Sequence, residues 1–409
     1  MFESINIHPV TFISALSTAL ELTSNGIASH HRRTAIIARY LGRSMGLSVH
    51  DDQTLVYTAL LHDIGAAADW YEKHYIVHGT GHDNLFHHAE NGYHILKDSP
   101  QLGHLALPIR YHHDRFQGGN PSGLAGQDIP LLSRIIHLSD RIEVLIKNQE
   151  HIFLQRDRIR EAIMRTTGQF DPDLVKAFIQ ISQREVFWLD VVTLNNENRF
   201  FSDLKFWNKY AFELDDMIHI ANVFSSVVDS TSHYTAAHSQ NVARVAQQLA
   251  LIRGFSTNEA KQFYLTGLVH DIGKLAVPND ILNKPGKLSI TEREIIKQHP
   301  YYSQRILEKV EGFEQIAHWI GTHHETLDGQ GYPFQLEACE IALGSRILAV
   351  ADIFSDLVED RPYREGLQAQ AAIAILRDLA SQNKIDSKLV DDVDVHQQDL
   401  MPLVSKFRT

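Results

Sequence analysis

The sequence has one cysteine, no surplus of positive charge and no long apolar run. In a chain of 409 residues, the single Cys339 excludes an intrachain disulfide framework and a zinc site built from several thiolates. The formal net charge of −12 disfavours a protein that binds polymeric nucleic acid, because such a protein needs a basic face. No apolar run approaches the ~20 residues that span a bilayer, and the N-terminus does not read as a signal peptide. We therefore expect a cytoplasmic protein without a membrane partner, of a length that favours two domains.

Histidine, by contrast, is abundant, with 25 residues against 19 phenylalanines. Many histidines stand beside apolar segments with helical spacing. After His30, for example, Thr34, Ile37, Ala38 and Leu41 follow at intervals that place them on one face of a helix. Sustained alternation of apolar and polar residues, which would indicate strands, is rare. The sequence therefore predicts an all-α fold.

The second half of the chain repeats the first. Seven histidines and aspartates recur in the same order 208–212 residues later, which indicates tandem copies of one domain. A polar stretch at residues 194–199 separates the copies, and helical patterning from Phe206 to Phe224 predicts a connecting helix. We expect an N-terminal domain at residues 1–200 and a C-terminal domain at residues 201–409. The repeated residues are His30, His62, Asp63, His88, His112, His113 and Asp140 in the first half, and His238, His270, Asp271, His299, His323, His324 and Asp352 in the second.

Each set combines five imidazoles with two carboxylates. Such donors suit Mn, Fe, Ni or Zn better than Ca or Mg. We expect two divalent transition-metal ions, Fe, Mn or Ni. Because Asp271 has two oxygens, it can reach the same ion as the adjacent His270 and also a second ion. Two ions a few Å apart can clamp a phosphate for hydrolysis. A lone helical histidine is usually only a core or surface residue, whereas a duplicated set of seven predicts metal centres.

The motifs around the second set are specific. In order they are His270-Asp271-Ile272-Gly273-Lys274, His299-Pro300, His323-His324-Glu325, Asp328-Gly329-Gln330-Gly331-Tyr332-Pro333 and Arg361-Pro362-Tyr363-Arg364. Over roughly residues 230–400 this order resembles the HD-GYP branch of the HD phosphohydrolase superfamily. The resemblance implies two tandem HD-type helical bundles. It also implies a metal-dependent phosphodiesterase that opens a bacterial cyclic dinucleotide, chiefly cyclic di-GMP, although a few tandem relatives prefer 3',3'-cGAMP.

The resemblance also implies roles for single residues. Asp271 and Lys274 would be catalytic, with Lys274 on the scissile phosphate or the leaving oxygen. In some family members a Glu four residues before the first histidine binds a third metal; Tyr234 stands there, so two ions and a linear dinucleotide product are expected. One ion would take His238, His270, Asp271 and Asp352, and the other His299, His323 and His324, with Asp271 as the bridge. The substrate would be held by Lys274, Gly331, Tyr332, Pro333, Arg361 and Arg364.

The first half keeps the ligand set but departs from the catalytic pattern. Ala66 stands where the second half has Lys274, and no Gly-Tyr-Pro or Arg-Pro-Tyr-Arg segment follows His113. We expect a second metal site in this half and a regulatory or structural role instead of hydrolysis. That site would use His30, His62, Asp63, His88, His112, His113 and Asp140.

Two other functions are open on the sequence. One is an HD-type nucleotide phosphohydrolase acting on dNTPs or alarmones, which the Gly-Tyr-Pro and Arg-Pro-Tyr-Arg segments disfavour. The other is a regulatory protein that senses a cyclic dinucleotide or a metal without hydrolysis. The sequence does not separate cyclic di-GMP from 3',3'-cGAMP, and it leaves a homodimer open as the assembly.

Overall fold

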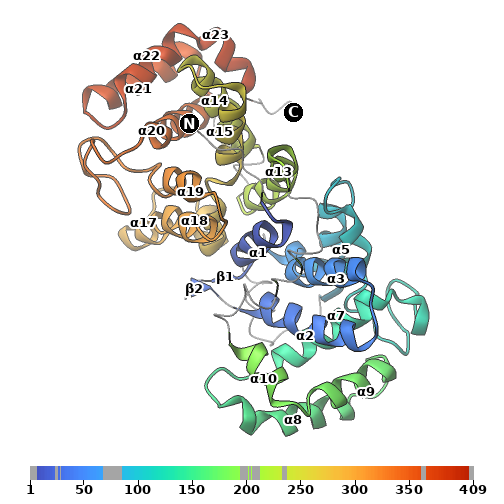
Figure 1. The fold of residues 1–409 in the computed structure, drawn as a ribbon. Helices are drawn as coiled ribbons and strands as arrows, with labels where there is room; N and C mark the ends of the chain where they lie inside the picture. The colour runs from blue at the N-terminus through green and yellow to red at the C-terminus, as the bar shows by residue number, and fades with distance from the viewer. Residues whose placement is uncertain are drawn as a thin grey trace. The chain divides into compact units, whose positions relative to one another are not determined.

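The computed structural model describes residues 7–23, 26–27, 29–67, 85–193, 201, 204, 212–232, 237–360 and 365–404. The described residues of His8–Ala211 form one compact unit, here the first unit, and those of Met1–Ile7 with Phe212–Thr409 form the second unit. In Figure 1 the first unit runs from blue to green and the second from yellow-green to red. The polar stretch at residues 194–199, where we place the domain boundary, lies outside the described residues.

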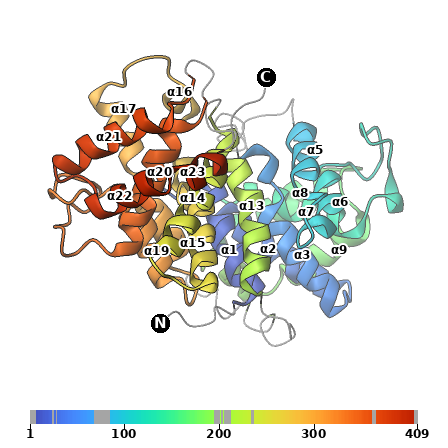
Figure 2. The same ribbon diagram turned by 90° about the horizontal axis from the view of Figure 1, so that it is seen from above.

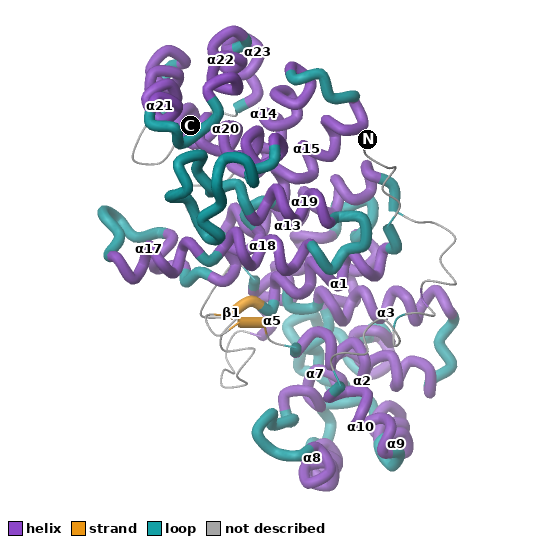
Figure 3. Tube along the Cα trace, turned by 60° about the vertical axis from the view of Figure 1, so that its left-hand side comes forward, coloured by secondary structure: helices purple, strands orange, loops and turns teal. Residues whose placement is uncertain are grey.

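The predicted all-α class is confirmed, as the purple helices of Figure 3 show. The only strands in the described ranges are β1 (Leu22–Thr23) and β2 (Gly26–Ile27), a short antiparallel pair. A single backbone bridge also joins Ile7 to Phe212. Within the described residues, no helix is both long and apolar enough to cross a bilayer.

The first unit is built around α2 (His30–Ser44). Its predicted apolar face is present, since Ile37, Ala38 and Leu41 are fully buried. Figure 2 shows α2 beside α3 and α7, against which it packs. The helices of this unit besides α2 are α1 (Pro9–Leu20), α3 (Val49–Leu61), η1 (Ile64–Ala66), α5 (Leu85–Leu96), η2 (Gly103–Leu105), α6 (Ala106–Arg110), η3 (Gly126–Asp128), α7 (Leu131–Val144), α8 (Ile152–Arg165), α9 (Pro172–Ile181) and α10 (Glu185–Val192).

The second unit is built around α14 (His238–Ile252), which repeats α2. Its residues Val242, Val245 and Leu249 are fully buried, and α14 packs against α15 and α20. The helices of this unit besides α14 are α13 (Leu214–Ser230), α15 (Thr257–Val269), η5 (Ile272–Ala276), α16 (Asn279–Leu282), α17 (Ile290–Lys297), α18 (His299–Leu307), α19 (Glu314–Gly321), α20 (Leu343–Val358), α21 (Ala369–Ser381), α22 (Ser387–Val395), α23 (Gln397–Leu400) and η6 (Met401–Leu403).

The helix that carries each His-Asp pair is bounded in the same way in both units. Ser48 and Ser256 each cap a helix by accepting a hydrogen bond from the amide three residues on, and Ser256 forms a full capping box with Glu259. The helices that follow, α3 and α15, each have 13 residues, and His62 and His270 are their C-cap residues. The serine therefore fixes where the helix begins, and the helix length then fixes where the His-Asp pair lies.

The helical pattern predicted through Met217 and Phe224 is present as α13, and both side chains are fully buried. This helix packs against α15 and η5 of the second unit. The start of the predicted pattern, at residues 206–210, lies outside the described residues. The described helix thus contributes its apolar face to the core around the second ligand set.

Candidate metal centre

The second unit brings its seven predicted ligands to one place. They come from five segments: the start of α14, the junction of α15 with η5, the start of α18, the residues after α19 and the middle of α20. All are buried except one histidine, which is partly exposed. The buried ligands are His238, His270, Asp271, His299, His323 and Asp352, and the partly exposed one is His324.

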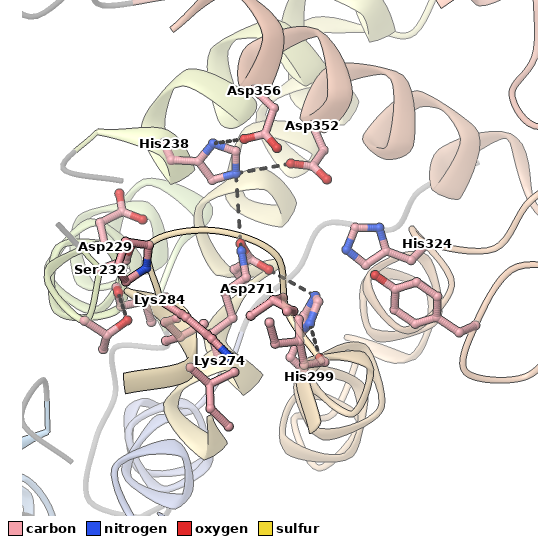
Figure 4. A pocket seen from close by; sticks show the side chains of 18 of the residues that line it. Asp229, Ser232, His238, Asp271, Lys274, Lys284, His299, His324, Asp352 and Asp356 are labelled. Carbon is pink, nitrogen blue, oxygen red and sulfur yellow. Dashed lines mark hydrogen bonds and ion pairs between the residues drawn. The ribbon is translucent and has the colours of Figure 1, made fainter. Parts of the chain in front are cut away.

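Asp271 lies at the centre of this cluster, and its two oxygens face different imidazoles. Its Oδ2 is 3.3 Å from Nε2 of His270 and 3.9 Å from Nε2 of His238. Its Oδ1 is 3.2 Å from Nε2 of His299. Asp352 lies on the side of His238, with its Oδ1 3.1 Å from Nε2 of that ring. Figure 4 shows Asp271 between His238 and His299. A carboxylate placed in this way can bridge two ions, so the geometry fits the role expected for Asp271.

Backbone carbonyls hold three of the imidazoles with Nε2 toward the centre. Nδ1 of His270, His299 and His323 each lies 2.6–2.8 Å from the carbonyl oxygen three residues earlier. A carbonyl only accepts, so each Nδ1 donates, and Nε2 of a neutral ring carries the lone pair. Burial lowers the pKa of His299 to about 3 and of His323 to about 4, so both rings are neutral near pH 7. Within the described residues, Nε2 of all three is buried without a hydrogen-bond partner, which a metal ion would supply.

Lys274 adds a positive charge to this site. It lies in η5, and its ammonium donates a hydrogen bond to Oδ2 of Asp271. Burial alone would lower the pKa of Lys274, but the charges of Asp271 and Asp352 raise it above its usual value. The ammonium is therefore fully charged and is held beside the bridging carboxylate.

Two carboxylates that we did not single out from the sequence lie behind His238. Its Nδ1 is 3.3 Å from Oε2 of Glu359 and 3.5 Å from Oδ1 of Asp356. Asp352, Asp356 and Glu359 are spaced at i, i+4 and i+7, which places them on one side of a helix. This spacing in the sequence could have indicated that Asp356 and Glu359 lie near the predicted ligand Asp352. A carboxylate behind a ligating imidazole orients the ring and raises its basicity.

A cavity of about 750 Å³ adjoins the cluster, within the size range of small-molecule sites. Asp271, Lys274, His299 and Tyr332 form part of its wall. Among the lining residues that were not predicted as site residues are Asp229, Ser232 and Asp356, all labelled in Figure 4. The cavity therefore places polar side chains and a fixed cation next to the ligand cluster.

The Gly-Tyr-Pro loop is anchored by Glu325, the residue after the two adjacent histidines. The Glu325 carboxylate is buried and accepts hydrogen bonds from three backbone amides, those of residues 334, 335 and 336. A Cβ atom at Gly331 would lie 2.4 Å from the backbone of Glu325, so only glycine permits this close approach. The Tyr332 ring lies against His324, with centroids 4.9 Å apart. One segment thus supplies both metal-type ligands and the loop beside the cavity.

Changing Glu325 to Gln is expected to destabilise the chain by roughly 2–4 kcal/mol, because a buried charged acceptor of three amides is lost. It should also raise KM for the substrate more than it lowers kcat, because Tyr332 loses its fixed place. Thermal unfolding and steady-state kinetics measure both effects. Glu340→Gln is the control, since Glu340 is exposed and accepts one amide hydrogen bond. An unchanged KM in Glu325→Gln would contradict the anchoring role.

Gly273 allows η5 to lie against the start of α18. A Cβ atom there would be 2.1 Å from the carbonyl oxygen of His299, and one at Gly65 would be 2.0 Å from that of His88. Gly273→Ala is therefore expected to displace His299, to cost about 1–3 kcal/mol of stability and to reduce metal retention. Thermal unfolding and elemental analysis measure these changes. Gly65→Ala should lose similar stability without a comparable loss of hydrolysis, and equal losses of hydrolysis would contradict this expectation.

Three predicted positions lie outside the described residues. They are Arg361 and Arg364, expected to contact the dinucleotide, and Tyr234, which stands where a third-metal ligand would be. Their parts in the site stay predictions.

The first unit brings together its own seven predicted ligands. Asp63 is again central, with Oδ2 3.3 Å from Nε2 of His62 and Oδ1 3.3 Å from Nε2 of His88. Asp140 Oδ1 is 3.3 Å from Nε2 of His30. The remaining two predicted ligands, His112 and His113, are buried beside His88.

This first cluster differs from the second at two positions. Ala66 is buried in η1, where the second unit has Lys274. His31 also faces Asp63, with Nε2 3.4 Å from Oδ2. We did not predict His31 as a site residue because its counterpart in the repeat is Ser239, so the comparison of the two halves hid it.

Two segments of the chain match the HD domain family, residues 27–145 and residues 222–389. Each match contains one complete ligand cluster. The duplication seen in the sequence is therefore a pair of HD domains.

Two relatives from Vibrio cholerae match along nearly the whole chain. The 3'3'-cGAMP-specific phosphodiesterase 1 is 31% identical over 95% of this chain and 91% of its own length. The 3'3'-cGAMP-specific phosphodiesterase 3 is 29% identical over 89% of each chain. A cyclic di-GMP phosphodiesterase from Pseudomonas aeruginosa is 40% identical over 35% of each chain. A crystal structure of a cyclic GMP-AMP-specific phosphodiesterase from V. cholerae shares the fold, with a TM-score of 0.66 at 24% identity over 96% of this chain and 98% of its own.

Proposed function

The chain belongs to the HD-GYP family, and on that premise we propose that its second unit is a metal-dependent phosphodiesterase that hydrolyses a cyclic dinucleotide to the linear dinucleotide. The observation that carries the proposal is the position of Asp271. Its carboxylate lies between two groups of imidazoles, pairs with Lys274 and faces a cavity of suitable size. A phosphodiester in that cavity would meet ligand atoms and a cation at the same place.

The buried lone pairs and carboxylates fit two divalent ions, for which we propose Fe, Mn or Ni. His238, His270, Asp271 and Asp352 would hold one ion, and His299, His323 and His324 the other, with Asp271 shared. When bound, the ions would neutralise charge on the phosphate and activate a water molecule.

Two side chains of the protein would act directly on the substrate. The Lys274 ammonium would donate a hydrogen bond to a phosphate oxygen and offset the negative charge that develops there during hydrolysis. Burial, together with the nearby charges of Asp352 and Asp271, raises the pKa of Tyr332, so its hydroxyl stays a neutral donor near pH 7. Tyr332 would thus position the dinucleotide by its ring face and its hydroxyl.

For the substrate we favour 3'3'-cGAMP over cyclic di-GMP. Both of the relatives described above that match along nearly the whole chain are 3'3'-cGAMP-specific enzymes, whereas the cyclic di-GMP enzyme described there matches about a third of it. The test is to incubate the full chain with Mn²⁺ and each cyclic dinucleotide and to separate the products by chromatography. We expect faster conversion of 3'3'-cGAMP to a linear dinucleotide, and no turnover of either compound would refute the proposal.

The alternative of an HD-type nucleotide phosphohydrolase is tested in the same assay with dNTPs as substrates. The two relatives that match along nearly the whole chain are cyclic-dinucleotide phosphodiesterases, which favours the cyclic dinucleotide. A homodimer stays a prediction, which light scattering of the purified chain would test.

A further inference from the structure

His31 is placed and oriented as a metal ligand in the first unit. It is 3% exposed, and its Nε2 lies 3.4 Å from Oδ2 of Asp63. The other ring nitrogen, Nδ1, is 3.3 Å from Oγ of Ser17, and that hydroxyl donates its hydrogen to the carbonyl of Leu60 at 2.6 Å. Because the Ser17 hydrogen is already used, Oγ accepts from Nδ1 of His31. When the ring carries a single proton, that proton is on Nδ1, and Nε2 therefore directs a lone pair at Asp63.

The surrounding imidazoles converge on the same carboxylate. Oδ2 of Asp63 lies within 3.4 Å of Nε2 of three rings, those of His30, His31 and His62. His62 donates Nδ1–H to the carbonyl of Ala59 at 2.7 Å, so its Nε2 also presents a lone pair to the site. One proton can join only two of these atoms, whereas a metal ion can be shared by all of them.

The other side of Asp63 shows the same convergence. Nε2 of His88 lies 2.9 Å from Nε2 of His113 and 3.4 Å from Nε2 of His112. His112 donates Nδ1–H to the carbonyl of Ile109, so its Nε2 lone pair points at His88. Imidazole nitrogens this close, beside a carboxylate oxygen, are the donor set of a late transition metal.

The carboxylate behind His30 strengthens this interpretation. Oε2 of Glu143 lies 2.6 Å from Nδ1 of His30, which leaves Nε2 directed toward Asp63 and Asp140. In metal sites, a carboxylate commonly accepts a hydrogen bond from the imidazole that binds the metal and so holds the ring in place. The contact is shorter than those behind His238, the counterpart of His30 in the second unit.

We propose that the first unit holds two divalent late transition-metal ions around Asp63, with His31 as an added ligand where the second unit has Ser239. The ions would be bound by His30, His31, His62 and Asp63 on one side and by Asp63, His88, His112 and His113 on the other. The two units differ in the group that lies beside the central aspartate. In the second unit, Oδ2 of Asp271 faces the ammonium of Lys274, and in the first unit Oδ2 of Asp63 faces Nε2 of His31.

This difference between the units favours metal binding in the first unit and disfavours hydrolysis there. An added imidazole strengthens the hold on a metal, while the absence of a cation at Ala66 removes the group that would stabilise charge on a phosphate. The first centre is therefore a site that holds metal without a cation for hydrolysis. The inference does not depend on the substrate or activity of the second unit.

The test is a metal measurement on the full chain carrying Asp271→Ala. This substitution removes the shared carboxylate of the second centre and leaves the ligands of the first centre unchanged. After removal of metals and reloading with Zn²⁺, elemental analysis should show ions retained, and a chelator titration gives their affinity. Adding His31→Ser, which copies Ser239, is expected to weaken retention at least about 10-fold. His50→Ser is the control, because His50 is exposed and should leave retention unchanged.

Loss of all metal in Asp271→Ala, or equal affinity with and without His31, would overturn the proposal. If the His31 variant does not fold, anomalous scattering from a crystal of the unmodified full chain decides instead. Peaks beside Asp63 within coordination distance of His31 support the proposal, and peaks that exclude His31, or none there, refute it.

Discussion

Replacing Lys274 by alanine is expected to lower kcat by about 10²–10³-fold, the usual cost of removing one preorganised donor to developing charge. The ammonium lies beside Asp271 and lines the cavity, so it meets the phosphate without belonging to the ligand set. Metal content should not fall, because removal of a cation from Oδ2 of Asp271 leaves that carboxylate more negative. Steady-state kinetics and elemental analysis of the same preparation test both parts.

The matched control for this change is Lys261→Ala. Lys261 is paired with Asp215 and is partly exposed, and it does not line the cavity. It should leave kcat unchanged. Full activity in Lys274→Ala would contradict the assigned role, and loss of metal together with activity would show that Lys274 supports the ligands instead of the phosphate.

The sequence predicted the ligand sets because each is carried by a strong local pattern. An apolar face follows His30 and His238, and a capped helix precedes His62 and His270, so the ligand positions are set by helix phase and length. The repeat doubled the evidence for each position. Residues fixed by local helix geometry are therefore the ones that the sequence reveals.

The residues that the sequence did not reveal depend on tertiary contacts. His31 differs between the halves, so the repeat concealed it, and only the fold brings it to Asp63 beside Ser17. Glu325 was visible in a motif, but its action on three amides depends on the path of the loop after it. Asp356 and Glu359 share a helix face with Asp352. Both contact His238, however, and that residue comes from another helix, so the contact could not be predicted from local sequence.

The largest expected effect comes from Asp271→Ala, compared with Asp63→Ala in the same assay. Asp271 is the one residue whose two oxygens face both imidazole groups beside the cavity, so its loss should reduce kcat by roughly 10⁴-fold or more. Asp63 has the same arrangement in the first unit, where Ala66 replaces the cation, so its loss should cost about 10-fold or less through stability. Both changes remove a buried carboxylate of the same kind, and the comparison therefore cancels the general cost of that loss. Comparable loss of turnover in the two variants would place hydrolysis in both units, and a larger loss in Asp63→Ala would reverse the assignment of the catalytic unit.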